Sequence, residues 1–146
     1  MAQNLNYEME SSFCGDDGCV RYGRYYKWDA ATVACPSGWH LPTLEEFETL
    51  FTAVGGKKIA AKALKSTSGW NSGGNGTDNY SFLALPAGYR GYKGGFYSVG
   101  DRAYFWSSTE ADSIFVYNMS LYSITGSAYL GNYNMVNGFS VRCLKD

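Results

Sequence analysis

The chain has 146 residues and a formal net charge of −1, with 17% charged and 17% aromatic residues. This length suits one domain, residues 1–146, which buries about two-thirds of the surface that the unfolded chain exposes. A nearly neutral chain offers no electrostatic attraction to nucleic acid or to an anionic membrane, since both require a basic surface. No apolar run reaches the length of a membrane-spanning helix. We therefore expect no nucleic-acid partner and no direct membrane insertion.

Four cysteines, Cys14, Cys19, Cys35 and Cys143, allow three disulfide pairings. We expect Cys14–Cys19, which closes a small loop, and Cys35–Cys143, which closes a loop of about a hundred residues and stabilises the fold by roughly 4–5 kcal/mol. A zinc site is the alternative, although the chain has no C-x2-C pair. Disulfides persist in oxidising surroundings, which indicates an extracellular or bacterial cell-surface location. The first residues lack the features of an export signal, so we expect any such signal to lie outside this chain.

Two main helices are predicted in the first half of the chain. Residues 25–34 are expected to form the first, which Pro36 ends. The second follows Thr43 and Glu46, whose spacing forms an S/T-x-x-E capping box. Apolar residues then recur every three or four positions, as one face of a helix requires: Leu44, Phe47, Leu50 and Phe51. Gly55 and Gly56 end this helix. A short third helix is expected over residues 57–64, with Ile59, Ala63 and Leu64 facing inward.

Loops and short antiparallel strands are expected elsewhere. Residues 4–7 are predicted to form an edge strand, and residues 66–79 form a polar loop with dense turn signals. Further strands, separated by Gly, Asn and Asp residues, are predicted at 82–85, 88–92, 96–98, 104–107, 114–122, 128–133 and 139–144. Helices followed by hairpins are typical of an α+β fold.

Six segments, taken in order along the chain, resemble the Fibrobacter succinogenes major paralogous domain. They are MAQNLNY at 1–7, CPSGWHLP at 35–42, LKSTSGW at 64–70, FLALPAGYR at 82–90, FWSSTE at 105–110 and GFSVRC at 138–143. This family is similar to the C-type-lectin fold, so the resemblance implies two main helices, a loop-rich antiparallel sheet and adjacent termini. The family occurs in secreted and surface proteins of gut and rumen bacteria, and the resemblance implies no defined activity.

The sequence predicts no metal site, no cofactor and no catalytic residues. Sugar-binding C-type lectins often hold calcium with a Glu-Pro-Asn or Gln-Pro-Asp triplet followed by Trp-Asn-Asp, and this chain has neither. Residues 75–79 supply one carboxylate, whereas calcium takes about six to eight oxygen ligands, so we interpret them as a turn. His40, the only histidine, lacks a nucleophile motif, and we interpret it as a hydrogen-bonded structural residue. Three tryptophans are expected in the core rather than against a ligand: Trp39, Trp70 and Trp106.

Residues 111–136 have the composition of a binding surface. Of these 26 residues, 13 are Tyr, Ser, Gly or Asn, and the one charged residue is Asp112. These four residue types dominate antibody loops, where tyrosine supplies rigid contact area and the small polar residues adapt. The same residues also suit the solvent-exposed face of an antiparallel sheet, so both interpretations remain open.

Strand alternation predicts which side chains contact a ligand. In residues 114–122, one apolar set is expected to face inward: Phe115, Tyr117, Met119 and Leu121. The alternate set is expected to face outward: Ile114, Val116, Asn118, Ser120 and Tyr122. Together with the following strand and the loops, this predicts ligand contacts at Asp112, Ile114, Asn118, Ser120, Tyr122, Ser123, Tyr129, Asn132 and Tyr133.

The same region resembles the variable segments that diversity-generating retroelements place at the C-terminus of C-type-lectin-like proteins. Adenine mutagenesis of AAC codons cannot yield Lys, Glu, Gln, Trp or Met, and residues 111–136 contain none of these except Met119 and Met135. We therefore expect a monomeric, extracellular recognition module with a protein or glycan ligand. The alternatives are an enzyme of the group of similar fold that includes formylglycine-generating enzymes and sulfoxide synthases, and a purely structural surface domain.

Overall fold

A computed structural model describes residues 1–146, which form three helices and nine strands. The elements, in chain order, are β1 (Ser12–Phe13), β2 (Tyr25–Tyr26), α1 (Trp28–Ala34), β3 (Trp39–His40), α2 (Leu44–Ala53), α3 (Lys57–Leu64), β4 (Tyr89–Arg90), β5 (Phe96–Tyr97), β6 (Arg102–Glu110), β7 (Phe115–Tyr122), β8 (Ala128–Asn134) and β9 (Leu144–Lys145). None of the helices has the length and apolar character needed to cross a bilayer.

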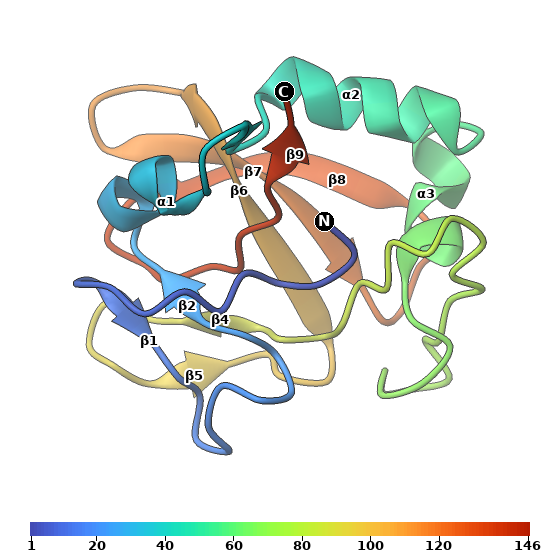
Figure 1. Ribbon diagram of the computed structural model, residues 1–146. Coiled ribbons are helices and arrows are strands. Elements are labelled where there is room, and N and C mark those ends of the chain that lie inside the picture. The colour runs from blue at the N-terminus through green and yellow to red at the C-terminus, as the bar shows by residue number, and fades with distance from the viewer.

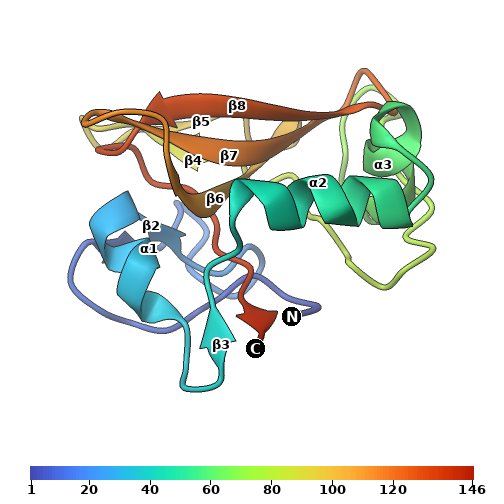
Figure 2. The ribbon, with the colours of Figure 1, turned by 90° about the horizontal axis from the view of Figure 1, so that it is seen from above.

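A three-stranded antiparallel sheet, in the order β6-β7-β8, is the largest in the protein. Three smaller antiparallel pairs surround it: β1 with β2, β3 with β9 and β4 with β5. In Figure 1 the three long strands cross the middle of the molecule, while α2 runs across the top and α3 lies at the right. The view from above in Figure 2 places the three strands on one side of the molecule and both termini, close together, on the other. The predicted mixture of helices and antiparallel sheets is therefore confirmed.

The sheet has a helix face and an opposite face, and apolar residues are buried on both. On the helix face, Phe105, Met119 and Leu121 are fully buried with residues of α2 and α3, such as Phe51 and Leu64. On the opposite face, Trp106 and Val116 join a second buried cluster that includes α1 and the C-terminal segment. Burial on both sides of β7 makes it the central strand of the core.

The second and third helices occupy the predicted segments. Thr43 caps α2 through its side chain, which accepts the N–H of Glu46 at 3.2 Å, while the Glu46 carboxylate accepts the N–H of Thr43 at 2.8 Å. This confirms the capping box. In α3, Ala63 and Leu64 are buried as predicted, but Ile59 is 51% exposed. The prediction for Ile59 is wrong because the buried stripe of α3 consists of Ala60, Ala61, Ala63 and Leu64, and Ile59 lies outside it, against Gly55.

The first helix is shorter than predicted, because its first residues form a strand. Tyr25 and Tyr26 pair with β1, and the N–H of Tyr26 also donates to the carbonyl of Phe139 at 2.8 Å. The helix therefore begins only at Trp28. Long-range backbone pairing has overridden the local helical pattern, as tertiary contacts commonly do.

Three predicted strands are not regular strands in the structure. Residues 4–7 and 82–85 run as extended or irregular chain with isolated backbone bonds, such as the Leu5 N–H to the Val141 carbonyl at 2.9 Å. In segment 139–144 only the last residue belongs to a strand, β9. The rest of that segment bonds in turn to β2, β6 and the N-terminal segment. It thus links several elements instead of extending one sheet.

Both predicted disulfides, Cys14–Cys19 and Cys35–Cys143, are present, and no cysteine is free. The second joins the end of α1 to the last residues of the chain. The termini are adjacent, as predicted, because the Met1 ammonium donates to the carbonyl of Cys143 at 3.0 Å.

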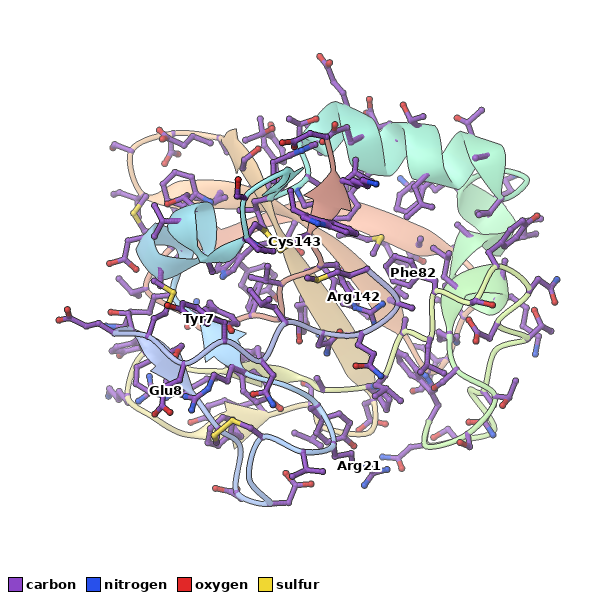
Figure 3. The ribbon with its side chains drawn as sticks, viewed as in Figure 1. Tyr7, Glu8, Arg21, Phe82, Arg142 and Cys143 are labelled. Carbon is purple, nitrogen blue, oxygen red and sulfur yellow. A yellow bond between two sulfur atoms is a disulfide. The ribbon has the colours of Figure 1, made fainter.

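Arg142, next to this disulfide, connects the chain ends to the 82–83 segment. It is 3% exposed and donates to the side chain of Asn4 at 2.6 Å and to the carbonyls of Phe82 and Leu83. Its guanidinium lies 4.6 Å from the centre of the Phe82 ring, beside which it is drawn in Figure 3. Burial lowers the pKa of Arg142 to about 10, and the carbonyl acceptors hold the charge in the interior.

Candidate functional site

A tyrosine-rich surface covers part of the sheet on the side opposite α2 and α3. Residues that pair across neighbouring strands point to the same face, so the strand registers define its members. We call it the tyrosine face and define it as Arg102 and Tyr104 from β6, Asn118, Ser120 and Tyr122 from β7, and Tyr129, Gly131 and Tyr133 from β8. Tyr104, Asn118 and Ser120 are buried beneath the other five residues, which form its exposed part.

One row of this face crosses all three strands. The guanidinium of Arg102 lies 4.8 Å from the centre of the Tyr122 ring, and the Tyr122 ring stacks on that of Tyr129 at 5.1 Å. At the β8 end of this row, the ammonium of Lys57 in α3 lies 5.8 Å from the centre of the Tyr129 ring. Such cation–ring contacts hold exposed rings in place. The ion pairs of the protein join Arg24 to Glu8 and His40 to two carboxylates, so neither cation of this row is neutralised by an acid.

A second row, of Tyr104 and Tyr133, is fixed by the core. The two rings meet at a centroid distance of 5.4 Å, and both pack against Phe139, which is fully buried. Tyr104 accepts a hydrogen bond from Arg102 at 3.1 Å, and burial raises the pKa of its hydroxyl. Tyr104 therefore stays uncharged at neutral pH. The face presents hydroxyl groups and aromatic carbon beside one guanidinium, and no carboxylate.

A gap separates the rings of β8, because Gly131 lies between Tyr129 and Tyr133 on the same face. A Cβ at Gly131 would meet no atom within 4 Å. Asn118, directly across from Gly131, donates through Nδ2 to the Gly131 carbonyl at 3.2 Å, while its Oδ1 is buried without a hydrogen-bond partner. A buried acceptor without a partner is unfavourable. Tyr129 and Tyr133 are therefore separated by a position without a side chain, which lies above the buried amide of Asn118.

The nine predicted ligand contacts do not lie together. Five lie on the tyrosine face: Asn118, Ser120, Tyr122, Tyr129 and Tyr133. Asn132 projects from the helix face, because it pairs with Tyr117. Asp112, Ile114 and Ser123 lie in loops. The Asp112 carboxylate accepts the N–H groups of Ile114 and Phe115 at 2.7 and 2.8 Å, which lowers its pKa. Its carboxylate thus closes the turn between β6 and β7.

The predicted exposure of several side chains is wrong. Val116, Asn118 and Ser120 were expected to face solvent but are 0%, 1% and 3% exposed. Strand alternation predicts a solvated face only where one side of the strand is uncovered, whereas α1, the C-terminal segment and the tyrosine rings cover the second face of β7. Ser123 is also buried, beside Asp101. Phe115 was expected inward but is 39% exposed, because it starts β7 outside the cluster that α2 and α3 cover.

Sequence reasoning missed four residues that contribute to this region: Arg102, Tyr104, Tyr89 and Tyr97. They lie outside residues 111–136, where the composition is unusual. The high tyrosine content of the whole chain was the one available signal, and it does not say which rings meet. Two motif tryptophans, Trp70 and Trp106, are buried at 5% and 0% exposure, which confirms their assignment to the core.

His40 is hydrogen-bonded, as predicted. Its Nδ1 lies 2.6 Å from Asp146 and its Nε2 lies 2.9 Å from Glu46, so a carboxylate occupies each ring nitrogen. The bond to Asp146, followed by that to Glu46, raises the pKa of His40. A general base needs a free nitrogen directed at its substrate, and His40 offers none in this arrangement.

In the 75–79 stretch, the carboxylate of Asp78 accepts the N–H of Leu83 at 2.7 Å. Nowhere do three or more acidic, histidine or cysteine side chains converge in a way that could hold a metal ion.

These features define a class of protein: a disulfide-stabilised domain of mixed helices and antiparallel sheets, with an aromatic surface on its largest sheet. The family model of the Fibrobacter succinogenes major domain matches residues 3–145, and the chain belongs to this family. The match covers nearly the whole chain and confirms the resemblance that its motifs indicated. Searches of curated proteins and of solved structures found no match.

Proposed function

We propose that this protein is an extracellular recognition module that binds a protein or a glycan through its tyrosine face. The observation that carries the proposal is the set of tyrosine rings held in fixed positions by stacking, by Arg102 and by the core. Rigid aromatic side chains give large contact area at a small loss of conformational entropy. No carboxylate, histidine or cysteine lies on this face, which suits binding better than acid–base or nucleophilic catalysis. The two disulfides are compatible with an extracellular location.

The proposal includes a C-type-lectin-like fold. Three features support this assignment: the adjacent termini, the long-range Cys35–Cys143 disulfide, and a late antiparallel sheet with two main helices against one face. In such an arrangement the late strands and their loops are free to vary while the disulfide and the helices maintain the scaffold. Loops and surfaces on a rigid scaffold are where binding residues concentrate.

Genetic diversification of this face is the second part of the proposal. On β7 and β8, the positions on this side of the sheet carry only residue types that an AAC codon yields by adenine mutagenesis: Val116, Asn118, Ser120, Tyr122, Tyr129, Gly131 and Tyr133. The two methionines that such codons cannot yield have structural positions. Met119 is buried under the helices, and Met135 packs against the second core cluster. An adenine-rich near-copy of the coding segment for residues 105–143, close to the gene, would support diversification, and an isolated gene without one would contradict it.

Binding screens with alanine variants test the recognition function. The wild-type protein would be screened on a microarray of neutral and acidic glycans and against a phage-displayed peptide library. Tyr122→Ala and Tyr133→Ala should each weaken binding to the selected ligands by about 2 kcal/mol or more, as interface anchors do. Tyr80→Ala is the matched control, because Tyr80 is 54% exposed and lies in the loop between α3 and β4, in no strand of the sheet. Ligands that bind all variants equally would contradict the proposal.

A further inference from the structure

A cleft opens beside the tyrosine face, where the β4–β5 hairpin meets the end of β8. Its volume is about 410 Å³, within the range of small-molecule sites. The lining side chains are Tyr89, Tyr92, Lys93, Tyr97, Tyr133, Asn134, Val136 and Asn137. Tyr133 belongs to both the cleft and the tyrosine face, so a ligand on that face can extend into the cleft.

The inner wall of the cleft is rigid. Tyr89 packs edge-on against Tyr104 and Phe139, at centroid distances of 5.5 and 6.0 Å, and lies 6.3 Å from Tyr133. Tyr104 and Phe139 are fully buried. The rings of Tyr89 and Tyr133 are therefore held in place by the core. They lose little conformational entropy when a ligand binds, which favours affinity.

The outer wall is also fixed, although it is exposed. Tyr97 is 51% exposed, and its ring lies across the backbone of its own hairpin. A Cβ at Gly91 or at Gly95 would come within 2.8 Å of the Tyr97 side chain, so the two glycines make room for it. The ring also packs on Tyr89 at 5.4 Å. An exposed aromatic ring is thus held in place at the mouth of the cleft.

Polar groups at the other side of the cleft have unused hydrogen-bonding capacity. Asn134 Oδ1 accepts the N–H of Val136 at 3.1 Å, and Asn137 Nδ2 donates to the Asn134 carbonyl at 3.2 Å. The amide donors of Asn134 and the amide oxygen of Asn137 have no partner in the protein. Lys93 is the only charged lining residue, and it forms no ion pair.

We propose that this cleft binds a sugar ring of a glycan. A pyranose has apolar C–H faces that pack on aromatic rings, and hydroxyl groups at its edge that both donate and accept hydrogen bonds. The cleft offers aromatic rings on its walls, with free donors on Asn134 and a free acceptor on Asn137. Without a carboxylate, it does not attract a cationic ligand. The inference rests on the proposed recognition function and names the ligand class for this part of the surface.

Titration with free sugars tests the inference directly. The probes are neutral disaccharides of glucose, galactose, mannose and xylose, followed by the amide signals of the ¹⁵N-labelled protein. Binding should shift the amide signals of Asn134 and Asn137. Tyr97→Ala should weaken it by about thirtyfold, as loss of an anchor does. Asn134→Asp is a second variant that retains the acceptor for the Val136 N–H and replaces the free amide donors with a carboxylate oxygen that can only accept, and it should weaken binding about tenfold. Tyr80→Ala serves as the control and should bind as the wild type does.

The outcomes separate this inference from the recognition function. If none of the sugars shifts these signals, or if Tyr97→Ala and Asn134→Asp bind the sugars unchanged, the sugar site is refuted. If displayed peptides are then still bound in a way that depends on Tyr122, the recognition function stands and the ligand is a protein. Conversely, sugar binding that depends on Tyr97 but not on Tyr122 would support the sugar site in the cleft. It would also show that the rest of the tyrosine face does not contact the sugar.

Discussion

Removing the Cys35–Cys143 disulfide is expected to destabilise the protein far more than removing Cys14–Cys19. The bonded residues are 108 positions apart in the first pair and 5 in the second. By the chain-entropy relation, a closed loop of 108 residues destabilises the unfolded state by about 4.8 kcal/mol at 25 °C, and a loop of 5 residues by about 2 kcal/mol. The longer bond also lies in the core, because Cys143 is 2% exposed and packs with the second buried cluster.

The comparison requires two double variants, Cys35→Ala with Cys143→Ala and Cys14→Ala with Cys19→Ala. Urea unfolding, followed by tryptophan fluorescence, measures the free energy of unfolding of each. At about 3 °C per kcal/mol for a protein of this size, the thermal midpoint should fall by about 15 °C in the first variant and about 6 °C in the second. An equal loss in the two variants, or a larger loss for the small loop, would refute the reasoning that loop length decides the contribution.

Three further predictions concern stability. Leu121→Ala, at a fully buried position, should lower the free energy of unfolding by about 2–5 kcal/mol. Phe115→Ala, at a position that is 39% exposed, should lower it by less than about 1 kcal/mol. Equal losses of the two variants in urea unfolding would contradict the assigned burial. Burial, followed by repulsion from Lys62, lowers the pKa of Lys65 to about 8, so above pH 8 the unfolded state binds more protons than the folded state and stability rises with pH. Between pH 7 and 9 the free energy of unfolding should increase by about 1 kcal/mol, and Lys65→Met should abolish this contribution; a pH profile that is the same in both proteins would refute it. Excess chelator should leave the thermal midpoint unchanged, and a fall of several degrees would reveal a structural metal.

Features that depend on nearby residues were predictable from the sequence. The capping box of Thr43 and Glu46 involves residues three positions apart, and α2 and α3 lie where the local pattern placed them. The Cys14–Cys19 pair closes a short loop. In each case the interacting groups are neighbours in the sequence, so their spacing alone carries the signal.

Apart from the Cys35–Cys143 disulfide and the adjacent termini, features that depend on distant residues were predicted less well. Tyr25 and Tyr26 follow a helical pattern locally, but backbone bonds to β1 and Phe139 make them a strand. Val116 and Asn118 were placed in solvent because alternation along β7 cannot reveal that α1 and the C-terminal segment cover that side. For the same reason the candidate site was predicted only in part. Tyr122, Tyr129 and Tyr133 were identified by composition, but their partners on β6 and on the β4–β5 hairpin are separated from them in sequence.

The most direct test of the tyrosine face as a recognition surface is a substitution at Gly131. A Cβ there meets no atom within 4 Å, and its backbone is not in the left-handed region that favours glycine. Gly131→Leu should therefore place a bulky side chain between Tyr129 and Tyr133 while changing the free energy of unfolding by less than about 0.5 kcal/mol. Gly131→Ala is the smaller matched control.

The measurement is the affinity of these two variants for the glycans or displayed peptides that the wild-type protein selects. The account predicts that Gly131→Leu folds normally and binds at least about thirtyfold more weakly, with Gly131→Ala in between. A Gly131→Leu protein that is as stable as the wild type and binds the same ligands with unchanged affinity would contradict recognition through the tyrosine face.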